Sequence, residues 1–459
     1  MKSKNINIEV ENFRAINKAD ISIDGITLVA GENGCGKSTI SKLLYFLFNT
    51  ALNYERIIKN NLVDKLSNFF RFLQISQQDI FSAIEDRKLR KKLQEKHMGA
   101  FSENMLSTIR HKDLNASQDI LLEQISSLKE IYSDIILPNN YNSNRLQFRI
   151  QRLVSIINDI TGKPESIDNE TQDLLKALDN ICEYIKKTFS RSINKIENRP
   201  ISVFKEELIK NFKDKVLPKK FNIKEFEDEI ISFEHEKISI PYNIQNVIYI
   251  DNDNPIVGYQ DSFAPEHWEH LISLLKDDTN EVFDLFNDFI SENEEQLYKH
   301  ISKTIKGEVF VSDEMFNADF KFKREDGSIF SLNDVATGIK SFSILQLLLK
   351  NRHLNNKTLL IIDEPESNLH PHWIVEYARL LVMIHKHIGV KLFLASHNPD
   401  MVSAIRFIAQ KENVLENTIF YLAEESNKYA YTYKNLGVDI DPIFESFNKA
   451  IDKINEYGI

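Results

Sequence analysis

Cysteine, glycine and long apolar runs are all scarce in this sequence of 459 residues. The only cysteines, Cys35 and Cys182, cannot form a disulfide framework, which favours a reducing cytoplasm. No apolar run approaches the roughly 18 residues of a membrane span, and the first residues lack the apolar core of a signal peptide. We therefore expect a cytoplasmic protein without a membrane segment. The formal net charge of −11 excludes a protein that coats nucleic acid by its overall charge.

The few glycines are concentrated in one place. Of the 13 glycines, three fall in the segment GENGCGKS at 31–38, which fits the phosphate-loop pattern G-x-x-x-x-G-K-[ST]. The preceding ITLVA (26–30) predicts a short buried strand, and the following STISKLLYFLFN (38–49) predicts a helix. A chance glycine turn would lack these flanks, so we predict a nucleotide-binding loop.

Each part of this loop has its own expected task. Backbone N–H groups and the helix dipole at its end favour a phosphate. Lys37 would reach the β- and γ-phosphates, and Ser38 would bind Mg²⁺. We therefore expect ATP and Mg²⁺ as ligands. The expected nucleotide-binding residues of the loop are Gly31, Asn33, Gly34, Gly36, Lys37, Ser38 and Thr39.

A second expected site element is the segment KTLLIIDEPESNLHP at 357–371. Its continuous apolar run is typical of a strand buried on both faces of a parallel sheet. Asp363 at the end of this run would hold Mg²⁺, and Glu364 would polarise the attacking water as general base. The alternative, two acids that cap the next helix, loses weight beside a phosphate loop.

Two further segments fit the same site. VKLFLASHNPD (390–400) predicts a strand that ends near His397, whose ring could hydrogen-bond a γ-phosphate as a second catalytic residue. The alternative for a lone histidine is a surface or core residue. In NDVATGIKSFSILQLLLKN (333–351), Gly338 precedes a long apolar helix. By itself, ATG at a helix start is only a cap.

These pieces, in this order, resemble the ABC-type ATPase head of the RecF, SMC and OLD-like group of AAA-family ATPases. The likeness covers about residues 1–50 and 241–425. The start IEVENFRAINKADISIDGITLVAGENGCGKST, with Arg14, resembles the N-terminus of that group. LIIDEPESNLHPHW resembles its Walker B motif and D-loop, and ASHNPD its H-loop. The resemblance implies an α/β fold, a P-loop ATPase head with a mixed sheet, and hydrolysis of ATP to ADP and phosphate.

The resemblance also implies a dimer of heads. Residues 336–340, ATGIK, would be the signature motif, so that Thr337 and Gly338 contact the nucleotide held by a second subunit. The usual serine-glycine-glycine pattern is replaced here by alanine-threonine-glycine. Residues 367–370 would be the D-loop. The Q-loop would follow the predicted strand NVIYI, at 251–255, where no glutamine occurs.

The phosphate loop and the acidic strand are far apart in the chain, which predicts an insertion. We expect the head to comprise residues 1–50 and 241–459 and a mostly helical insertion to occupy 51–240. Apolar residues at helical spacing recur in it, for example at 121–136 and 170–189. Strict heptads over many turns are lacking, which favours a short helical hairpin over a long coiled coil.

Basic clusters at 87–96, 186–195 and 213–220 interrupt this acidic sequence. They are either solvated helix faces or a contact site for DNA, RNA or an acidic partner. One patch would contain Arg87, Lys88, Arg90, Lys91 and Lys92.

No further chemistry is predicted. We expect no zinc site, no nucleophile triad and no TOPRIM nuclease domain after the head. A lone head with a helical insertion resembles the ATPase subunits of the Septu, retron-associated and PARIS anti-phage systems, which are paired with a separate nuclease or toxin chain. This resemblance implies a defence ATPase that forms a homodimer or higher homo-oligomer. A DNA-repair ATPase of the RecF or SMC type is the alternative, and a transporter ATPase is disfavoured by the insertion.

Overall fold

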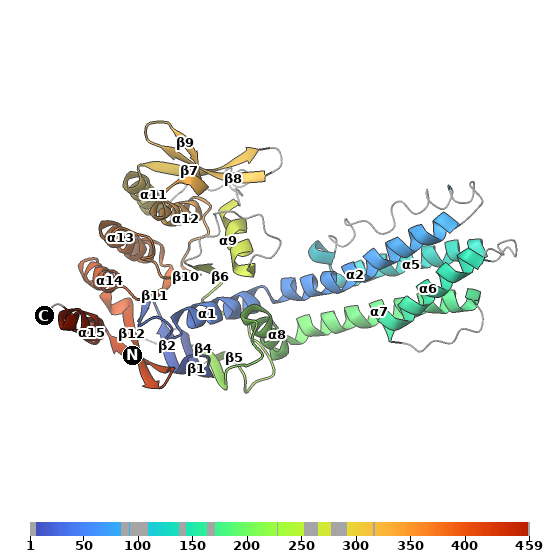
Figure 1. The fold of residues 1–459 in the computed structure, drawn as a ribbon, viewed down its shortest axis with the longest axis horizontal. Helices are drawn as coiled ribbons and strands as arrows, with labels where there is room; N and C mark the ends of the chain where they lie inside the picture. The colour runs from blue at the N-terminus through green and yellow to red at the C-terminus, as the bar shows by residue number, and fades with distance from the viewer. Residues whose placement is uncertain are drawn as a thin grey trace. The chain divides into compact units, whose positions relative to one another are not determined.

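The computed structural model divides into two compact units (Figure 1). The head comprises Met1–Leu52 and Pro200–Ile459, and the helical unit comprises Asn53–Arg199. No helix among the described residues combines the length and the apolar character that a membrane crossing needs. The described residues are 6–83, 91, 109–136, 144–162, 170–226, 228–251, 265–276, 292–314 and 317–457.

A sheet of ten strands forms the centre of the head, in the order β5-β4-β1-β2-β13-β12-β3-β11-β10-β6. A second sheet has three strands in the order β7-β8-β9. The bounds of the large sheet are β1 Ile6–Phe13, β2 Ile16–Ile23, β3 Ile26–Ala30, β4 Lys220–Glu225, β5 Asp228–Ser232, β6 Asn246–Ile250, β10 Thr358–Asp363, β11 Lys391–Ser396, β12 Thr418–Asn427 and β13 Ala430–Gly437. Those of the small sheet are β7 Gly307–Glu314, β8 Asn317–Arg324 and β9 Ile329–Ser331.

One part of the large sheet consists of parallel strands. Strands β12, β3, β11, β10 and β6 pair in parallel, whereas β1 pairs with β2 and β4 in antiparallel. Both β3 and β10 are fully buried, as their apolar runs predict. The register sets Ser396 beside Ala30 and Asp363 beside Ala395. The carboxyl ends of β3, β10 and β11 therefore meet at one edge.

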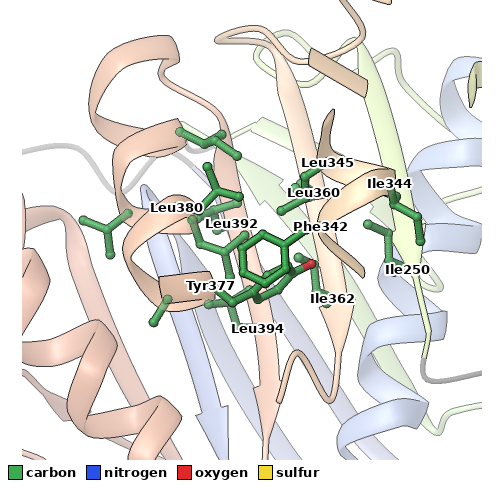
Figure 2. Packing of buried hydrophobic residues seen from close by; sticks show 14 of the residues in the cluster. Ile250, Phe342, Ile344, Leu345, Leu360, Ile362, Tyr377, Leu380, Leu392 and Leu394 are labelled. Atoms are coloured by element: carbon green, nitrogen blue, oxygen red, sulfur yellow. The ribbon is translucent and has the colours of Figure 1, made fainter. Parts of the chain in front are cut away.

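Helices cover both faces of this parallel part. Helix α1 contacts β6, β10 and β11. On the opposite face, α12 and α13 pack on the strands, and Phe342 meets Tyr377 edge-on with ring centroids 5.1 Å apart (Figure 2). The described helices of the head are α1 Lys37–Leu52, α8 Ile201–Phe212, α9 Glu266–Lys276, α11 Glu292–Ile305, α12 Thr337–Lys350, α13 Pro371–Ile388, α14 Pro399–Lys411 and α15 Asp441–Tyr457, with 3₁₀ turns at Leu332–Asp334 and Leu415–Asn417.

The helical unit has its own core. Its named helices are α2 Tyr54–Ala83, α5 Leu114–Ile136, α6 Asn144–Thr161 and α7 Glu170–Asn198. Helix α7 contacts the other three, and Ile181, Ile185 and Phe189 on it are fully buried. The helices predicted around 121–136 and 170–189 are confirmed as α5 and α7.

The boundary predicted at residue 240 differs from the structure. Residues 200–240 lie in the head, where they form α8, β4 and β5. Strand β4 pairs with β1, with Ile223 opposite Ile8, and so extends the ten-stranded sheet. The physical reason is pairing, because β1 would otherwise present an open strand edge. The helical spacing that dominates the earlier part of the segment concealed these two short strands.

Candidate functional site

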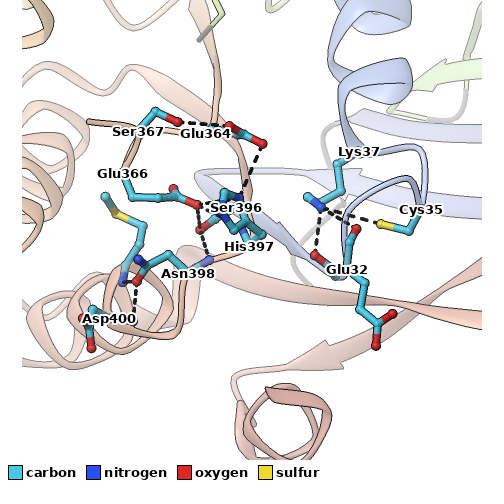
Figure 3. A network of polar contacts seen from close by, with 12 residues as sticks. Glu32, Cys35, Lys37, Glu364, Glu366, Ser367, Ser396, His397, Asn398 and Asp400 are labelled. Atoms are coloured by element: carbon cyan, nitrogen blue, oxygen red, sulfur yellow. Dashed lines mark hydrogen bonds and ion pairs between the residues drawn. The ribbon is translucent and has the colours of Figure 1, made fainter. Parts of the chain in front are cut away.

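The phosphate loop connects β3 to α1, as its flanks predict. Gly34 and Gly36 have φ angles of 84° and 94°, which lie in the left-handed region that glycine adopts without strain. Lys37 is buried at the start of α1, and its Nζ donates to the carbonyl oxygens of Gly31 and Glu32 at 2.8 Å each. These carbonyls hold the ammonium group over the loop (Figure 3).

Residues of β12 and β13 pack against the phosphate loop. The hydroxyl of Tyr433 donates to the Cys35 carbonyl at 3.0 Å. Burial raises the pKa of Tyr433 well above its ordinary value. A Cβ added to Gly31 would lie 2.8 Å from Cys35 Sγ and 2.9 Å from Ala423 Cβ, so only glycine fits there. No local pattern could predict Tyr433 at this site, because it follows the loop by almost 400 residues.

Asp363 ends β10 and is buried beside the loop. The pKa of its carboxyl is raised, chiefly because burial disfavours the charged form, while a hydrogen bond from Ser38 and the charge of Lys37 oppose the shift. Its Oδ1 has no hydrogen-bond partner among the described residues. The hydroxyl of Tyr249, on β6, donates to Oδ2 at 3.4 Å.

This arrangement fits a hard cation. Mg²⁺ takes oxygen ligands in proteins and binds through carboxylates and phosphate oxygens. Asp363 offers an unsatisfied carboxylate oxygen, and the Ser38 hydroxyl lies within reach of the same carboxyl. A cation there would restore the charged carboxylate that burial alone disfavours.

Glu364 follows Asp363 in a strained backbone conformation. Its φ angle is 53°, which is uncommon for a residue other than glycine and typically costs about 1–3 kcal/mol. Its N–H donates to the Ala395 carbonyl at 2.8 Å, and Ser367 Oγ donates to its Oε2 at 3.0 Å. These bonds fix the carboxylate beside the edge where the strands end. Such strain is typical of functional sites.

His397 lies just after β11 and faces two carboxylates. Its Nδ1 is 3.4 Å from Glu364 Oε1 and 3.3 Å from Glu366 Oε1 (Figure 3). The next residue, Asn398, caps α14 by accepting from the Asp400 N–H at 2.7 Å. Glu366 was not expected at this site, although it belongs to the same quoted DEPE segment.

The two residues of the expected signature motif have different environments. Thr337 is exposed at the first turn of α12 and lines a small pocket together with Asp363, Glu364 and Ser367. Gly338 is buried, and a Cβ there would lie 2.8 Å from the Trp373 ring of α13. Close helix packing within one chain is therefore a reason for this glycine that the sequence did not reveal.

The remaining predicted residues lie on the phosphate loop or the first turn of α1, or in segments of which the structure describes a single residue. Asn33 and Gly34 are exposed, and Thr39 is half-buried in the first turn of α1. Of the predicted basic patch at 87–92, only Lys91 is described, and it is exposed. Of the segment 251–255, only Asp251 is described, and it accepts from His267 Nε2 at 2.8 Å and Trp268 Nε1 at 2.9 Å.

Solved structures give weak likenesses. The Smc head domain with an extended coiled coil from Pyrococcus furiosus, bound to the C-terminal domain of ScpA, is 11% identical over 98% of each chain, with a TM-score of 0.33. The Smc head domain with a coiled coil and joint from Pyrococcus yayanosii is 10% identical, over 97% of this chain and 99% of that one, with a TM-score of 0.37. These TM-scores are too low to bear on function.

The family comparison is more informative. No curated protein matches the chain. The family model described as AAA ATPase domain matches residues 4–402, which is most of the 459 residues. The match includes the phosphate loop, the acidic strand and His397. The chain therefore belongs to the AAA ATPase domain family and is an ATPase.

Proposed function

We propose that this chain binds ATP with Mg²⁺ at the carboxyl ends of β3, β10 and β11 and hydrolyses it there. The observation that carries the proposal is the meeting of three separate segments at one edge. The register sets Ser396 beside Ala30 and Asp363 beside Ala395, and His397 Nδ1 lies 3.4 Å from Glu364 Oε1. These segments are distant in sequence, so the fold alone unites them.

Each residue has a proposed role in the reaction. Lys37 leaves the loop carbonyls and binds the β- and γ-phosphates, and loop N–H groups of Gly31, Asn33, Gly34 and Gly36 bind their oxygens. Ser38 and Asp363 hold Mg²⁺, which supplies charge neutralisation to the phosphates. Glu364 polarises the attacking water, and His397 hydrogen-bonds the γ-phosphate.

We further propose that two heads join around ATP. Thr337 is exposed at the N-terminus of the long helix α12, and such a terminus favours an anion. A second copy could receive this terminus at its own bound nucleotide. The exposed start of α12 supports the proposal, and the resemblance to ABC-type heads motivates it.

Biochemical tests follow from these roles. Lys37→Ala should abolish ATP binding, whereas Glu364→Gln should bind ATP but hydrolyse it at least about 100-fold more slowly, the usual loss of a general base. In mass photometry, Glu364→Gln should form dimers with ATP and monomers without it. Hydrolysis by Glu364→Gln at the wild-type rate would refute the assignment of the base, and monomers under both conditions would refute the dimer.

The biological role is proposed from a resemblance. Stand-alone heads with a helical insertion resemble the ATPase subunits of anti-phage systems, so we propose a cytoplasmic sensor or regulatory subunit that works with a separate nuclease or toxin. The alternative is a DNA-repair ATPase. It is favoured by one observation, that Lys186, Lys187 and Arg191 are exposed along α7.

Purification of the Glu364→Gln protein from its native host separates these roles. A stoichiometric nuclease or toxin chain, found by mass spectrometry and retained after nuclease treatment, would support the defence role. Recovery of DNA with replication or repair proteins, without a dedicated partner, would favour the repair role. Lys37→Ala serves as the matched control, because it should not be trapped in the nucleotide-bound state.

A further inference from the structure

Glu366 is a buried acid with no role in the reaction described above. It lies in the turn between β10 and α13 and is only 5% exposed. The general base, Glu364, is two residues before it and is partly exposed. A carboxylate is rarely buried unless other groups compensate for its lost hydration. The contacts of Glu366 therefore indicate what it is for.

Its contacts all lead to the segment that carries His397. Glu366 Oε1 accepts from Ser396 Oγ and from the His397 N–H, each at 2.9 Å (Figure 3). The same oxygen is 3.3 Å from His397 Nδ1. Ser396 Oγ in turn accepts from the Asn398 N–H at 3.1 Å. One carboxylate oxygen thus accepts hydrogen bonds from the His397 backbone and the Ser396 hydroxyl, and it lies within ion-pair distance of the ring, whose Nδ1 has no hydrogen-bond partner among the described residues.

This burial is costly to the protein. Burial raises the pKa of the Glu366 carboxyl, and the hydrogen bonds from the His397 N–H and Ser396 oppose that shift. The second oxygen, Oε2, has no hydrogen-bond partner among the described residues. An apolar side chain would fill the same space without this penalty. A need at His397 explains why an acid stands there.

The contacts of Glu366 also connect the segment that carries Glu364 to the segment that carries His397. Glu364 Oε2 accepts from Ser367 Oγ, which holds the side chain of the general base in place. Glu366 lies in the chain between these two residues. Through Glu366 the segment 364–367 also holds His397. A displacement of either segment would change the 3.4 Å separation between His397 Nδ1 and Glu364 Oε1.

We propose that Glu366 is a positioning residue for His397, which it holds beside Glu364 through the acceptor Oε1. The inference rests on the proposed function, because His397 needs positioning only if it acts on the phosphate. We assign Glu366 no direct contact with ATP, because its side-chain contacts lead to Ser396 and His397. Its loss should therefore lower kcat and leave the KM for ATP nearly unchanged, because the phosphate loop is intact.

Variants at Glu366 test whether this residue acts as a hydrogen-bond acceptor or only fills space. Glu366→Gln keeps an acceptor at Oε1, whereas Glu366→Ala removes it. We expect kcat to decrease in the order wild type, Glu366→Gln, Glu366→Ala, with a loss of about 10- to 100-fold for alanine, by analogy with partners that orient metal-bound histidines. Glu412→Gln is the matched control, since that acid pairs with Lys386 on α13 and takes no part in the site.

A double variant tests whether Glu366 acts through His397. If it does, Glu366→Ala combined with His397→Ala should have the kcat of His397→Ala alone, because coupled residues are not additive. A further loss of similar size in the double variant would overturn the proposal. Wild-type kcat in Glu366→Ala, or a parallel loss of kcat and ATP affinity, would overturn it as well.

An NMR measurement without nucleotide tests the positioning of His397 separately from ATP hydrolysis. The ¹⁵N-histidine NMR signal of His397, assigned by its absence in His397→Ala, should move in Glu366→Ala and stay in place in Glu412→Gln. An unmoved signal in Glu366→Ala would refute the positioning role even if the enzyme is active. If wild type does not hydrolyse ATP but the His397 signal moves in Glu366→Ala, the proposed function is wrong. The contact between Glu366 and His397 is then still supported. Should Glu366→Ala not fold, Ser396→Ala, which removes one donor to Oε1, takes its place in both assays with the same expected directions.

Discussion

At the scale of single residues, the site depends on acids that the fold holds in unfavourable surroundings. Asp363 is buried with one oxygen unsatisfied, and Glu364 has a φ angle of 53°. Burial raises the pKa of Asp363, so the nucleotide-free site disfavours its charge. A bound cation would relieve this penalty, which is why Mg²⁺ affinity is a sensitive probe of single contacts here.

Tyr249→Phe tests one such contact. The variant removes the hydroxyl that donates to Asp363 Oδ2 at 3.4 Å. We expect the Mg²⁺ concentration for half-maximal ATP hydrolysis to rise by up to about tenfold, the worth of a hydrogen bond to a charged group. Tyr421→Phe is the control, because that hydroxyl accepts from the Ser22 N–H, with no contact to Asp363. Equal Mg²⁺ dependence in all three proteins would contradict the prediction.

At the scale of elements, helices α12 and α13 approach closely beside the pocket that Thr337, Asp363 and Tyr377 line. Gly338 allows this approach, because its missing side chain leaves room for the Trp373 ring. Trp373 also meets Phe342 edge-on, with centroids 5.5 Å apart. The start of α12, and with it Thr337, is thus positioned by packing on α13.

Gly338→Ala should therefore destabilise the protein. The added methyl would lie 2.8 Å from the Trp373 ring, and such overpacking costs about 1–3 kcal/mol. This exceeds the gain in helix propensity of about 1 kcal/mol. In a Trp373→Leu background the penalty should be smaller, because the ring is gone while Leu369 Cδ2 stays 3.2 Å from the added methyl. Urea unfolding of the four proteins of this cycle measures the coupling, and additive effects would contradict the packing explanation.

His385 gives a pH-dependent test at the junction of α13 and β11. Its Nδ1 donates to the Val390 carbonyl at 2.8 Å, and burial lowers its pKa from the ordinary 6.5. The unfolded chain then binds a proton that the folded chain does not. The stabilisation is therefore present above pH 6.5 and is lost as the pH falls through the lower folded value.

Unfolding free energies at pH 7.5 and 5.5 should show this loss. We expect wild type to lose on the order of 1 kcal/mol more than His385→Gln between the two values. Glutamine keeps a polar side chain there but cannot be protonated. Equal losses in the two proteins would mean that His385 is not responsible for the pH dependence.

At the scale of the whole molecule, the chain leaves the head after Leu52 and returns at Pro200. The helical unit between them has a separate core, which includes Leu121, Ile157 and Ile181. An insertion of this kind adds a surface without interrupting the sheet that forms the site. Lys186, Lys187 and Arg191 on α7 are exposed on that surface.

Reversal of the three α7 charges, Lys186→Glu, Lys187→Glu and Arg191→Glu together, tests this surface. If these residues are a solvated face, as we expect for a defence ATPase, ATP hydrolysis and DNA affinity should each change by less than about twofold. A loss of DNA affinity, with the salt dependence falling by about one unit of slope per lost contact, would instead support the repair ATPase. Glu183→Lys on the same helix is a charge-change control.

The sequence by itself determined the local parts of the site. Gly31 to Ser38 formed a recognisable loop, the apolar run 359–362 predicted a buried strand, and helical spacing predicted α5 and α7. Such features depend on neighbours within a few residues, so a pattern carries them. The head fold and the ATPase family follow from the same motifs, although the roles of the site residues stay predictions.

Only the tertiary structure decided which distant groups meet. Tyr249, Glu366 and Tyr433 reach the site from strands and a turn far apart in the chain, and β4 was assigned to the head only by its pairing with β1. These contacts depend on strand order and register, which no local pattern specifies. The physical reason is that parallel strands gather their carboxyl ends whatever the length of chain between them.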